Sequence, residues 1–359
     1  IAAMSPGLGI VSPDLPHEEI DLDGLLVFPG FIDAHVHLTG GGGEGGPETR
    51  VPPVQFTSMT TSGVTTCVGV LGTDGTTRTV RDLVATTLGM RRLGINAYCY
   101  TGSYRYPVPT LTGSVRDDIV FIDPVIGVGE LALSDHRSSQ PTLDELLRIA
   151  SDAYVAGMMS NKAGVVHCHM GSGDRGFELL HEALETAEIP ARVYHPTHIN
   201  RERWLFDAAR KLAERGVTVD LTAFPDDGET LLAPEAIARW RAEGGPMDRL
   251  TCSSDGAGCL PTFDADGRLL HMDVGRPATL LEAIQSLIAA GEPLSEVLPV
   301  FTSNVARHLA LVGKGALVVG ADADLVALTP EGELRHLWAM GRPMIQDAEP
   351  CEFGPFEAR

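Results

Sequence analysis

Two histidines separated by one residue are the first feature of this sequence that could do chemistry. His35 and His37 stand at the end of an apolar run that begins near residue 25. In a β-strand, side chains two positions apart point to the same face with their Cα atoms about 7 Å apart, so both imidazoles can reach one metal ion. The spacing alone is a weak signal, because such a pair can also be two buried or two surface histidines.

Three more side chains of metal-binding type stand where an apolar run meets a loop. They are His169, His198 and Asp255. In an eight-stranded α/β barrel the carboxyl ends of the strands meet at one face, and active sites lie there. We therefore expect four histidines and one aspartate, far apart in the chain, to converge on a metal centre.

Glu130 is a candidate to complete a centre with two metals. Two cations about 3.5–4 Å apart repel each other, so they need a bridging anion. Glu130 follows Val128 and Gly129 in another apolar run and would face the same centre. The alternative interpretation is a carboxylate at the rim of the barrel or in a salt bridge.

An alternation of short β-branched runs with helix-like stretches must position these side chains. Such alternation is typical of βα units around a parallel sheet. Strands are predicted over residues 25–34, 63–71, 95–101, 125–133, 164–169, 191–197, 217–223 and 249–254. Helices are predicted over residues 142–157, 202–215, 277–291 and 294–311. Eight strands are the number in a TIM-like (β/α)8 barrel, the α/β fold that we predict for residues 25–312.

The last part of the sequence changes character. Short strand-like runs begin at Ala316, Asp324 and His336, separated by Gly, Asp and Pro residues typical of turns. We predict a small β-sandwich appendage in residues 313–359 and expect residues 1–24 to supply its other part. The barrel would then be inserted between the two halves of the appendage.

Composition and charge exclude several classes of partner. The 359 residues carry a formal charge of −21 with a pI of about 4.9, so the surface would repel nucleic acid and anionic membranes. An anionic small molecule would need arginines placed in its pocket. Six scattered cysteines without a C-x-x-C pair predict reduced thiols and a cytoplasmic protein. The sequence has no run of about 18 apolar residues and no visible signal peptide.

The candidate ligands occur in strings that resemble a known family. The string from Pro29 to His37, with the later histidines and aspartate, is similar to the amidohydrolase superfamily. More narrowly, several strings together resemble the bacterial isoaspartyl dipeptidases, from about residue 20 to the C-terminus. They are Gly40-Gly-Gly-Gly-Glu44-Gly-Gly-Pro, Leu71-Gly-Thr73-Asp, Thr101-Gly-Ser-Tyr104, Ser134-Asp-His-Arg137-Ser, Pro196-Thr-His198-Ile-Asn-Arg201 and Ser253-Ser-Asp255-Gly.

The resemblance implies hydrolysis of isoaspartyl (β-aspartyl) dipeptides at two divalent metals, with zinc as the expected ion. His35 and His37 would hold one metal with Asp255. His169 and His198 would hold the second. A hydroxide that bridges the metals would attack the amide carbon. The resemblance also implies a homo-oligomer.

The resemblance assigns the remaining catalytic and substrate-binding roles. Asp255 would take the proton of the hydroxide and pass it to the departing amine, while Tyr104 would stabilise the oxyanion. Glu44 would pair with the free α-ammonium of the substrate. Its carboxylates would be bound in bidentate fashion by Arg137 and Arg201. Two more residues would hold the ammonium and α-carboxylate end, namely Gly42 and Thr73.

The sequence departs from the family at two positions. The family bridges its metals with a carboxylated lysine, but the matching position here is Glu130, with one extra residue before it. We expect the glutamate to bridge without a carbamate, since Lys162 precedes its strand and would lie at the wrong end of the barrel. Cys259 stands where the family places a serine on the substrate carboxylate, and a thiol is a weaker donor. Three histidines outside the ligand pattern are expected to support the ligands or the core: His136, His167 and His195.

Two alternative functions follow from the same residues. The first is another amidohydrolase, a cyclic amidase or an N-acyl amino acid deacylase. Glu44, Arg137 and Arg201 favour a zwitterionic dipeptide over a cyclic imide, which has no ammonium and no free carboxylate. The second is a non-catalytic scaffold that kept the barrel and lost the site, although each expected histidine and the aspartate are present.

Overall fold

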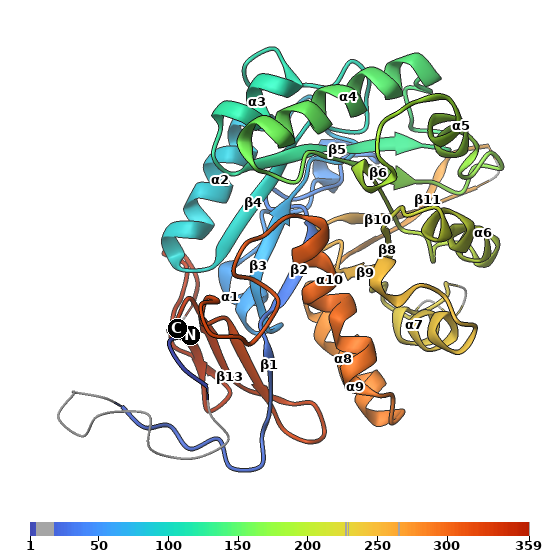
Figure 1. The fold of residues 1–359 in the computed structure, drawn as a ribbon. Helices are drawn as coiled ribbons and strands as arrows, with labels where there is room; N and C mark the ends of the chain where they lie inside the picture. Colours follow the sequence, from blue (N-terminus) through green and yellow to red (C-terminus); the bar gives the residue numbers. More distant parts are fainter. Residues whose placement is uncertain (5–17, 227, 229, 265, 359) are drawn as a thin grey trace.

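Eight parallel strands lie at the centre of the computed structural model, with helices packed around them (Figure 1). Residues 1–4, 18–226, 228, 230–264 and 266–358 are described. Six strands form one sheet in chain order: β2 (Phe31–Val36), β3 (Val64–Gly69), β4 (Asn96–Thr101), β5 (Val125–Leu133), β6 (Val165–Met170) and β7 (Tyr194–Thr197). Two more form a parallel pair: β8 (Val219–Thr222) and β9 (Leu250–Ser253). The α/β class and the number of parallel strands are confirmed; seven of the eight predicted ranges each match one strand, and the first matches β2 only in its second half.

The pair β8–β9 lies between the two edges of the six-stranded sheet. β7 contacts β8, and β9 contacts β2. Beyond the strand ends, the amide of His37 donates to the carbonyl of Gly256 at 2.8 Å, and the amide of Ile199 donates to the carbonyl of Asp220 at 3.3 Å. The sheet is therefore strongly curled, and the carboxyl ends of its strands surround a common centre.

Ten α-helices and four short 3₁₀ helices are present in the described residues. The α-helices are α1 (Phe56–Thr60), α2 (Val80–Leu93), α3 (Val115–Phe121), α4 (Leu143–Ser160), α5 (Glu178–Thr186), α6 (Arg203–Glu214), α7 (Ala233–Ala242), α8 (Ala278–Ala289), α9 (Leu294–Val297) and α10 (Ser303–His308). The 3₁₀ helices are η1 (Pro47–Thr49), η2 (Ala191–Val193), η3 (Met247–Arg249) and η4 (Leu298–Phe301). The single helix predicted over 294–311 is wrong, because Pro299 cannot donate a helical hydrogen bond and Thr302 has non-helical backbone angles.

Local sequence explains the clearest helix, α4. Thr142 accepts a hydrogen bond from the amide of Glu145, and the Glu145 carboxylate accepts one from the amide of Thr142. This capping box satisfies amides that have no partner within the helix. Leu146, Ile149 and Ala153 then bury one face at helical spacing.

The strand that carries Glu130 is buried along all nine residues. Its glycines let it approach β6 closely: a Cβ atom at Gly127 would lie 2.6 Å from the carbonyl oxygen of Val165, and one at Gly129 would lie 2.6 Å from that of His167. Only glycine fits at such an approach. These glycines therefore bring Glu130 against the histidines of the neighbouring strand.

A five-stranded antiparallel sheet lies beside the parallel strands, near both chain ends (Figure 1). Its order is β1 (Leu26–Pro29), β12 (Leu325–Leu328), β13 (Leu334–Ala339), β14 (Arg342–Gln346) and β15 (Glu349–Pro350). The prediction of one strand over 25–34 is wrong, because the chain divides at Gly30 and β1 pairs with β12. A Cβ atom at Gly30 would lie 2.2 Å from the Thr65 hydroxyl, so the division requires glycine.

The remaining predictions for this sheet have mixed outcomes. The run that begins at Ala316 is not a strand, and its residues Val318 and Val319 are exposed. The amide of Gly320 donates to the carbonyl of Ile1 at 2.9 Å, which places the first residue beside the C-terminal segment. Much of the predicted N-terminal contribution falls on residues 5–17, which lie outside the described part of the chain.

A hairpin that the sequence analysis missed follows β9. It consists of β10 (Cys259–Phe263) and β11 (Leu269–Val274), which pair in antiparallel register. Its signal was present as two short runs on either side of Asp264, Asp266 and Gly267, which are turn-forming residues. The hairpin lines the approach to the candidate site described below.

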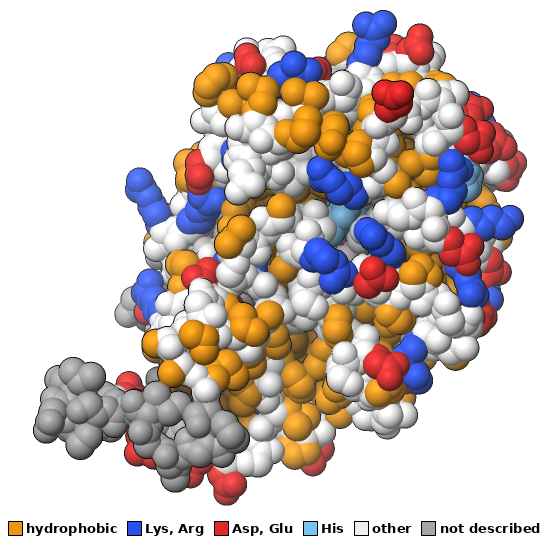
Figure 2. Space-filling model, viewed as in Figure 1, with side chains coloured by type: hydrophobic (Ala, Val, Ile, Leu, Met, Phe, Trp, Pro, Cys, Tyr) orange, Lys and Arg blue, Asp and Glu red, His pale blue; other side chains and the backbone are white. Residues whose placement is uncertain are grey.

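The amino ends of β6 to β9 surround a hollow lined by basic residues. Figure 2 shows Lys and Arg side chains gathered around it on one face of the molecule. The basic and imidazole side chains that line it are Lys162, Arg192, Arg249, Arg307 and His308. This end of the curled sheet is opposite to the carboxyl ends that carry the candidate ligands. Within the described residues, no helix is long and apolar enough to cross a membrane.

We predict that Asp324 stabilises the contact between the two sheets. Its buried carboxylate accepts hydrogen bonds from Lys314 at 2.8 Å, from the Met340 amide at 2.7 Å and from Asn96 on β4. Asp324→Ala leaves these donors without a buried acceptor, so the free energy of unfolding in urea should fall by about 3 kcal/mol. Asp322→Ala is the control, because Asp322 also pairs with Lys314 but is half exposed; it should cost under about 1 kcal/mol. Equal losses for the two variants would contradict this role.

Candidate active site

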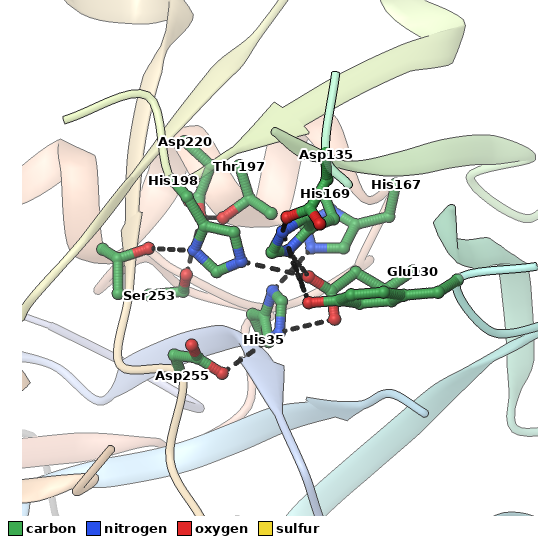
Figure 3. Close-up of polar contacts among 12 residues, drawn as sticks. His35, Glu130, Asp135, His167, His169, Thr197, His198, Asp220, Ser253 and Asp255 are labelled. Atoms are coloured by element: carbon green, nitrogen blue, oxygen red, sulfur yellow. Dashed lines mark hydrogen bonds and ion pairs between the residues drawn. The ribbon is translucent and has the colours of Figure 1, made fainter. Parts of the chain in front are cut away.

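The predicted metal ligands converge at the carboxyl ends of β2, β6, β7 and β9 (Figure 3). The Oδ1 atom of Asp255 lies 3.4 Å from Nε2 of His35 and 3.1 Å from Nε2 of His37. Nδ1 of His169 and Nε2 of His198 approach a second carboxylate, at 2.8 and 3.0 Å. All five side chains are buried. The structure thus brings together residues spread over 220 positions of the sequence.

Glu130 supplies that second carboxylate and lies between the two groups. Its Oε1 atom faces His169 and His198, while its Oε2 atom lies 3.4 Å from Nε2 of His35 and 3.9 Å from Nε2 of His37. One oxygen therefore faces each half of the cluster, as a bridging ligand requires. Lys162 lies at the far end of its strand and donates to backbone carbonyls.

The donor atoms fit divalent cations. Oε2 of Glu130, Oδ1 of Asp255 and Nδ1 of His37 are buried without a hydrogen-bond partner, which is costly unless something else compensates them. Two groups of three side chains hold their ligand atoms within 4.8 Å of one another: His35, His37 and Asp255, and His35, Glu130 and His198. Imidazole nitrogens with carboxylate oxygens are the donor set of zinc and related ions.

The pKa values of the cluster residues also favour bound cations. Burial alone would raise the pKa of Glu130, but His35 and His169 hold it well below its usual range. Burial is likewise outweighed at Asp255, where His35 and His37 lower the pKa to about 2. Burial would lower the pKa of His35, yet the Glu130 and Asp255 carboxylates raise it to about 9. Two ionised carboxylates therefore lie buried together, and cations would balance their charge.

Asp135 orients one of the candidate ligands. Its Oδ2 atom accepts a hydrogen bond from Nε2 of His169 at 2.9 Å, so the other ring nitrogen of His169 faces Glu130. A carboxylate behind a ligand histidine fixes the tautomer and the ring orientation. Asp135 was not among the predicted site residues, although it lies inside the string from Ser134 to Ser138, two residues before Arg137.

The other ligands are held from behind in the same way. Nδ1 of His198 lies 2.7 Å from the Thr222 hydroxyl, and Nδ1 of His35 lies 2.9 Å from Nε2 of His167. His198 and Asp255 also have positive φ angles, 62° and 52°, immediately after their strands. Non-glycine residues rarely adopt this conformation, and it is often found at functional sites.

The substrate-binding candidates surround a pocket next to the cluster. Its wall includes Gly42, Glu44, Thr73, Tyr104, Arg137, Arg201 and Cys259, together with His37, His169 and Asp255. All the residues that the resemblance assigned to substrate and oxyanion thus share one cavity. Arg78 was missed; it lines the same pocket and donates to the carbonyls of Thr39 and Val51, which holds the glycine-rich loop.

The two arginines of the pocket differ in what they already bind. The Nε and Nη2 atoms of Arg137 donate to the two oxygens of Asp135 at 3.0 and 2.8 Å, and its Nη1 lies 3.5 Å from Glu44. The Nη1–Nη2 edge of Arg137 is left open by Asp135, and its Nη1 is also within ion-pair distance of Glu44. Nε of Arg201 is buried without a hydrogen-bond partner, and its guanidinium lies over the ring of Phe224.

Three groups of the pocket could take part in binding and catalysis. Oε2 of Glu44 is buried without a hydrogen-bond partner and can accept from a cation. The Tyr104 hydroxyl lies 2.7 Å from Nδ1 of His169, and burial raises its pKa well above the usual value, so the phenol keeps its proton. Burial raises the pKa of the Cys259 thiol to about 12, so it stays neutral.

The three histidines outside the ligand pattern differ in their burial and in their contacts. His167 lies directly behind His35, and His195 lies behind His167. Both are buried, which agrees with a supporting role. His136 is about half exposed and packs against Phe263 of the hairpin. All six cysteines are free thiols, as predicted.

Comparison with known proteins agrees with this geometry. Residues 26–344 match the amidohydrolase family. Among solved structures, β-aspartyl dipeptidase from the thermophilic, keratin-degrading Fervidobacterium islandicum AW-1, in complex with a β-Asp-Leu dipeptide, is 46% identical, with a TM-score of 0.90 over 94% of this chain and 89% of that chain. Another structure of that organism's enzyme is 44% identical, with a TM-score of 0.89 over 98% of this chain and 92% of its own.

A more distant relative is the allantoinase of Rubrobacter xylanophilus. It is 26% identical over 387 residues, covering 91% of this chain and 80% of that protein. The extent of the family match, and the identity to the two Fervidobacterium structures over nearly their whole length, establish the relationship. The chain belongs to the amidohydrolase family and, within it, to the family of the β-aspartyl dipeptidases.

Proposed function

We propose that this protein hydrolyses β-aspartyl dipeptides. One observation carries the proposal: Glu44 and Arg201, each with a buried polar atom that has no hydrogen-bond partner, line the same small pocket as His37, His169 and Asp255 of the cluster. A pocket with both charges suits a small zwitterion that carries an ammonium and a carboxylate. The 46% identical Fervidobacterium structure, which is in complex with β-Asp-Leu, supports this substrate class.

The pocket residues would recognise the two ends of the dipeptide. Glu44 accepts from the α-ammonium, beside Gly42 and Thr73. Arg201 and the open edge of Arg137 bind carboxylates. Two arginines close to the cavity also explain how a chain with a charge of −21 can bind an anionic ligand. Cys259 lies in the wall, where it offers a weak thiol donor.

The cluster residues would hold two divalent ions. His35, His37 and Asp255 form one half, His169 and His198 form the other, and a single glutamate lies between them. When bound, two such ions supply an activated nucleophile at neutral pH and polarise the amide carbonyl.

The protein's own groups then move the proton and stabilise charge. Asp255 is ionised and borders the pocket, so it can accept the proton of the attacking water and deliver it to the departing amine. The protonated hydroxyl of Tyr104 can donate to the oxyanion. Asp135 and Thr222 keep the histidines in place during these steps.

Several finer features are part of the same proposal. We take the curled parallel sheet as a (β/α)8 barrel over about residues 25–312, with β1 assigned to the antiparallel sheet. That sheet would be one layer of a small β-sandwich built from both chain ends. We also propose zinc as the metal, a cytoplasmic location and a homo-oligomer; free thiols at all six cysteines support a reducing compartment.

A substrate panel tests the function directly. We expect β-Asp-Leu to be hydrolysed, and α-Asp-Leu, hydantoin and N-acetyl amino acids to be left unchanged, because only the first places an ammonium, a carboxylate and an amide together as the pocket requires. Release of free amino acid is the measurement. Turnover of hydantoin without turnover of β-Asp-Leu would favour a cyclic amidase instead.

Metal content tests the centre and the role of Glu130. Metal-replete protein should hold about two divalent ions per chain by inductively coupled plasma mass spectrometry. Glu130→Gln should hold fewer, because a neutral amide cannot bridge two cations as a carboxylate does. Glu235→Gln, at an exposed position, is the control. Wild-type protein without metal would favour a non-catalytic scaffold, and an unchanged Glu130→Gln content would remove the bridging role.

Asp255→Asn tests the proton acceptor. The value of kcat should fall by about 10³-fold, since the amide cannot take a proton, while the melting temperature stays near that of the wild type. Asp266→Asn, at an exposed position of the hairpin turn, should keep full activity. Metal content is measured in parallel to detect loss of a ligand. Full turnover by Asp255→Asn would show that another group accepts the proton.

A further inference from the structure

A column of buried side chains continues behind the cluster, away from the pocket. Nδ1 of His35 lies 2.9 Å from Nε2 of His167, and Nδ1 of His167 lies 3.0 Å from Nδ1 of His195. Nε2 of His195 lies 3.1 Å from the hydroxyl of Thr251, which donates to Oδ1 of Asp220 at 2.6 Å. These five residues come from β2, β6, β7, β9 and β8, and all are fully buried. Figure 3 labels three members of the column, His35, His167 and Asp220.

Asp220 is the acceptor at the far end of the column. Besides Thr251, the hydroxyls of Thr197 and Ser253 donate to its Oδ2 atom at 2.8 and 2.6 Å. Three hydroxyl donors on two oxygens leave Asp220 as an acceptor only. A polar network in which every buried group has a hydrogen-bond partner makes a core specific in its geometry.

The acceptor at one end determines the direction of each hydrogen bond. A neutral imidazole has one N–H and one lone pair. Because the Thr251 hydroxyl donates to Asp220, its lone pair receives the Nε2–H of His195, and Nδ1 of His195 must accept. His167 therefore donates from Nδ1 and accepts at Nε2, and His35 donates from Nδ1.

The direction of these hydrogen bonds determines which nitrogen of His35 is free to bind a metal. When His35 carries a single proton, as a metal ligand must, that proton is on Nδ1 and the lone pair is on Nε2, the atom that lies 3.4 Å from both the Glu130 and the Asp255 carboxylates. A reversal anywhere in the column would put a proton on that atom and remove it as a ligand. The column ends at Asp220 rather than at the basic hollow, since His308 contacts the His195 ring only by packing, with centroids 4.2 Å apart.

We propose that Asp220, Thr251, His195 and His167 form a positioning chain that holds His35 in the tautomer able to bind metal. The inference rests on the proposed metal centre. None of these four residues touches the substrate pocket, so they act only through His35. The proposal also explains why a well-packed barrel interior has imidazoles and hydroxyls where apolar side chains would fill the same space at lower desolvation cost.

Metal affinity of substitution variants tests the chain. The isosteric Thr251→Val removes one hydroxyl and keeps the shape, so it should weaken zinc binding several-fold in competition with a coloured chelator. His167→Leu removes the acceptor of His35 and should weaken one of the two zinc ions about 10–100-fold. His167→Gln keeps an acceptor oxygen in place and should restore most of that affinity. Thr66→Val is the matched control, because its buried hydroxyl has no hydrogen-bond partner.

A second measurement distinguishes tautomer control from packing. In zinc-loaded protein with ¹⁵N-labelled histidine, NMR should show His35 protonated at Nδ1 in the wild type and in His167→Gln, and altered in Thr251→Val. Zinc affinities and His35 signals equal to wild type in both Thr251→Val and His167→Leu would overturn the proposal. Neither readout uses substrate, so a wild type that binds zinc as expected but leaves β-Asp-Leu intact would defeat the proposed function while the chain is still supported.

Discussion

The structure depends on one electrostatic constraint, which is that two ionised carboxylates are buried among imidazoles. Glu130 and Asp255 lie on either side of His35, and both stay deprotonated because positive groups surround them. Burial of like charges is tolerated only with compensation. Divalent ions would provide it, and they would at the same time provide the chemistry. The close approach of β5 to β6 at Gly127 and Gly129 brings Glu130 into this position.

The second requirement is that the ligands are oriented before any metal arrives. Asp135 holds His169, Thr222 holds His198, and hydrogen-bonded partners from the sheet interior hold His35. These partners differ in chemistry, yet each contacts the ring nitrogen that faces away from the centre. A centre built on strand ends with fixed tautomers loses little entropy when it binds metal.

The pocket shows how a strongly acidic protein can select a small zwitterion. Asp135 accepts two hydrogen bonds from one edge of Arg137 and so also restricts the movement of that guanidinium toward solvent. Arg201 remains open, and Glu44 presents an unpaired oxygen. The resemblance implies a different residue at two positions: Cys259 adds a neutral thiol to the pocket wall, and Glu130 lies in the neighbouring cluster. Neither change removes a charge that the substrate needs.

The sequence by itself determined which elements form and which residue types gather at strand ends, because strand and helix periodicity and capping are local properties. The alternation of strand-like and helix-like runs predicted eight parallel strands, and the resemblance of several motifs to a known family predicted the residues of one pocket. Tertiary structure decided the rest. The loss of β1 to the other sheet and the column behind His35 both depend on partners more than 20 residues away. Such choices are made when strands meet, and no local pattern records them.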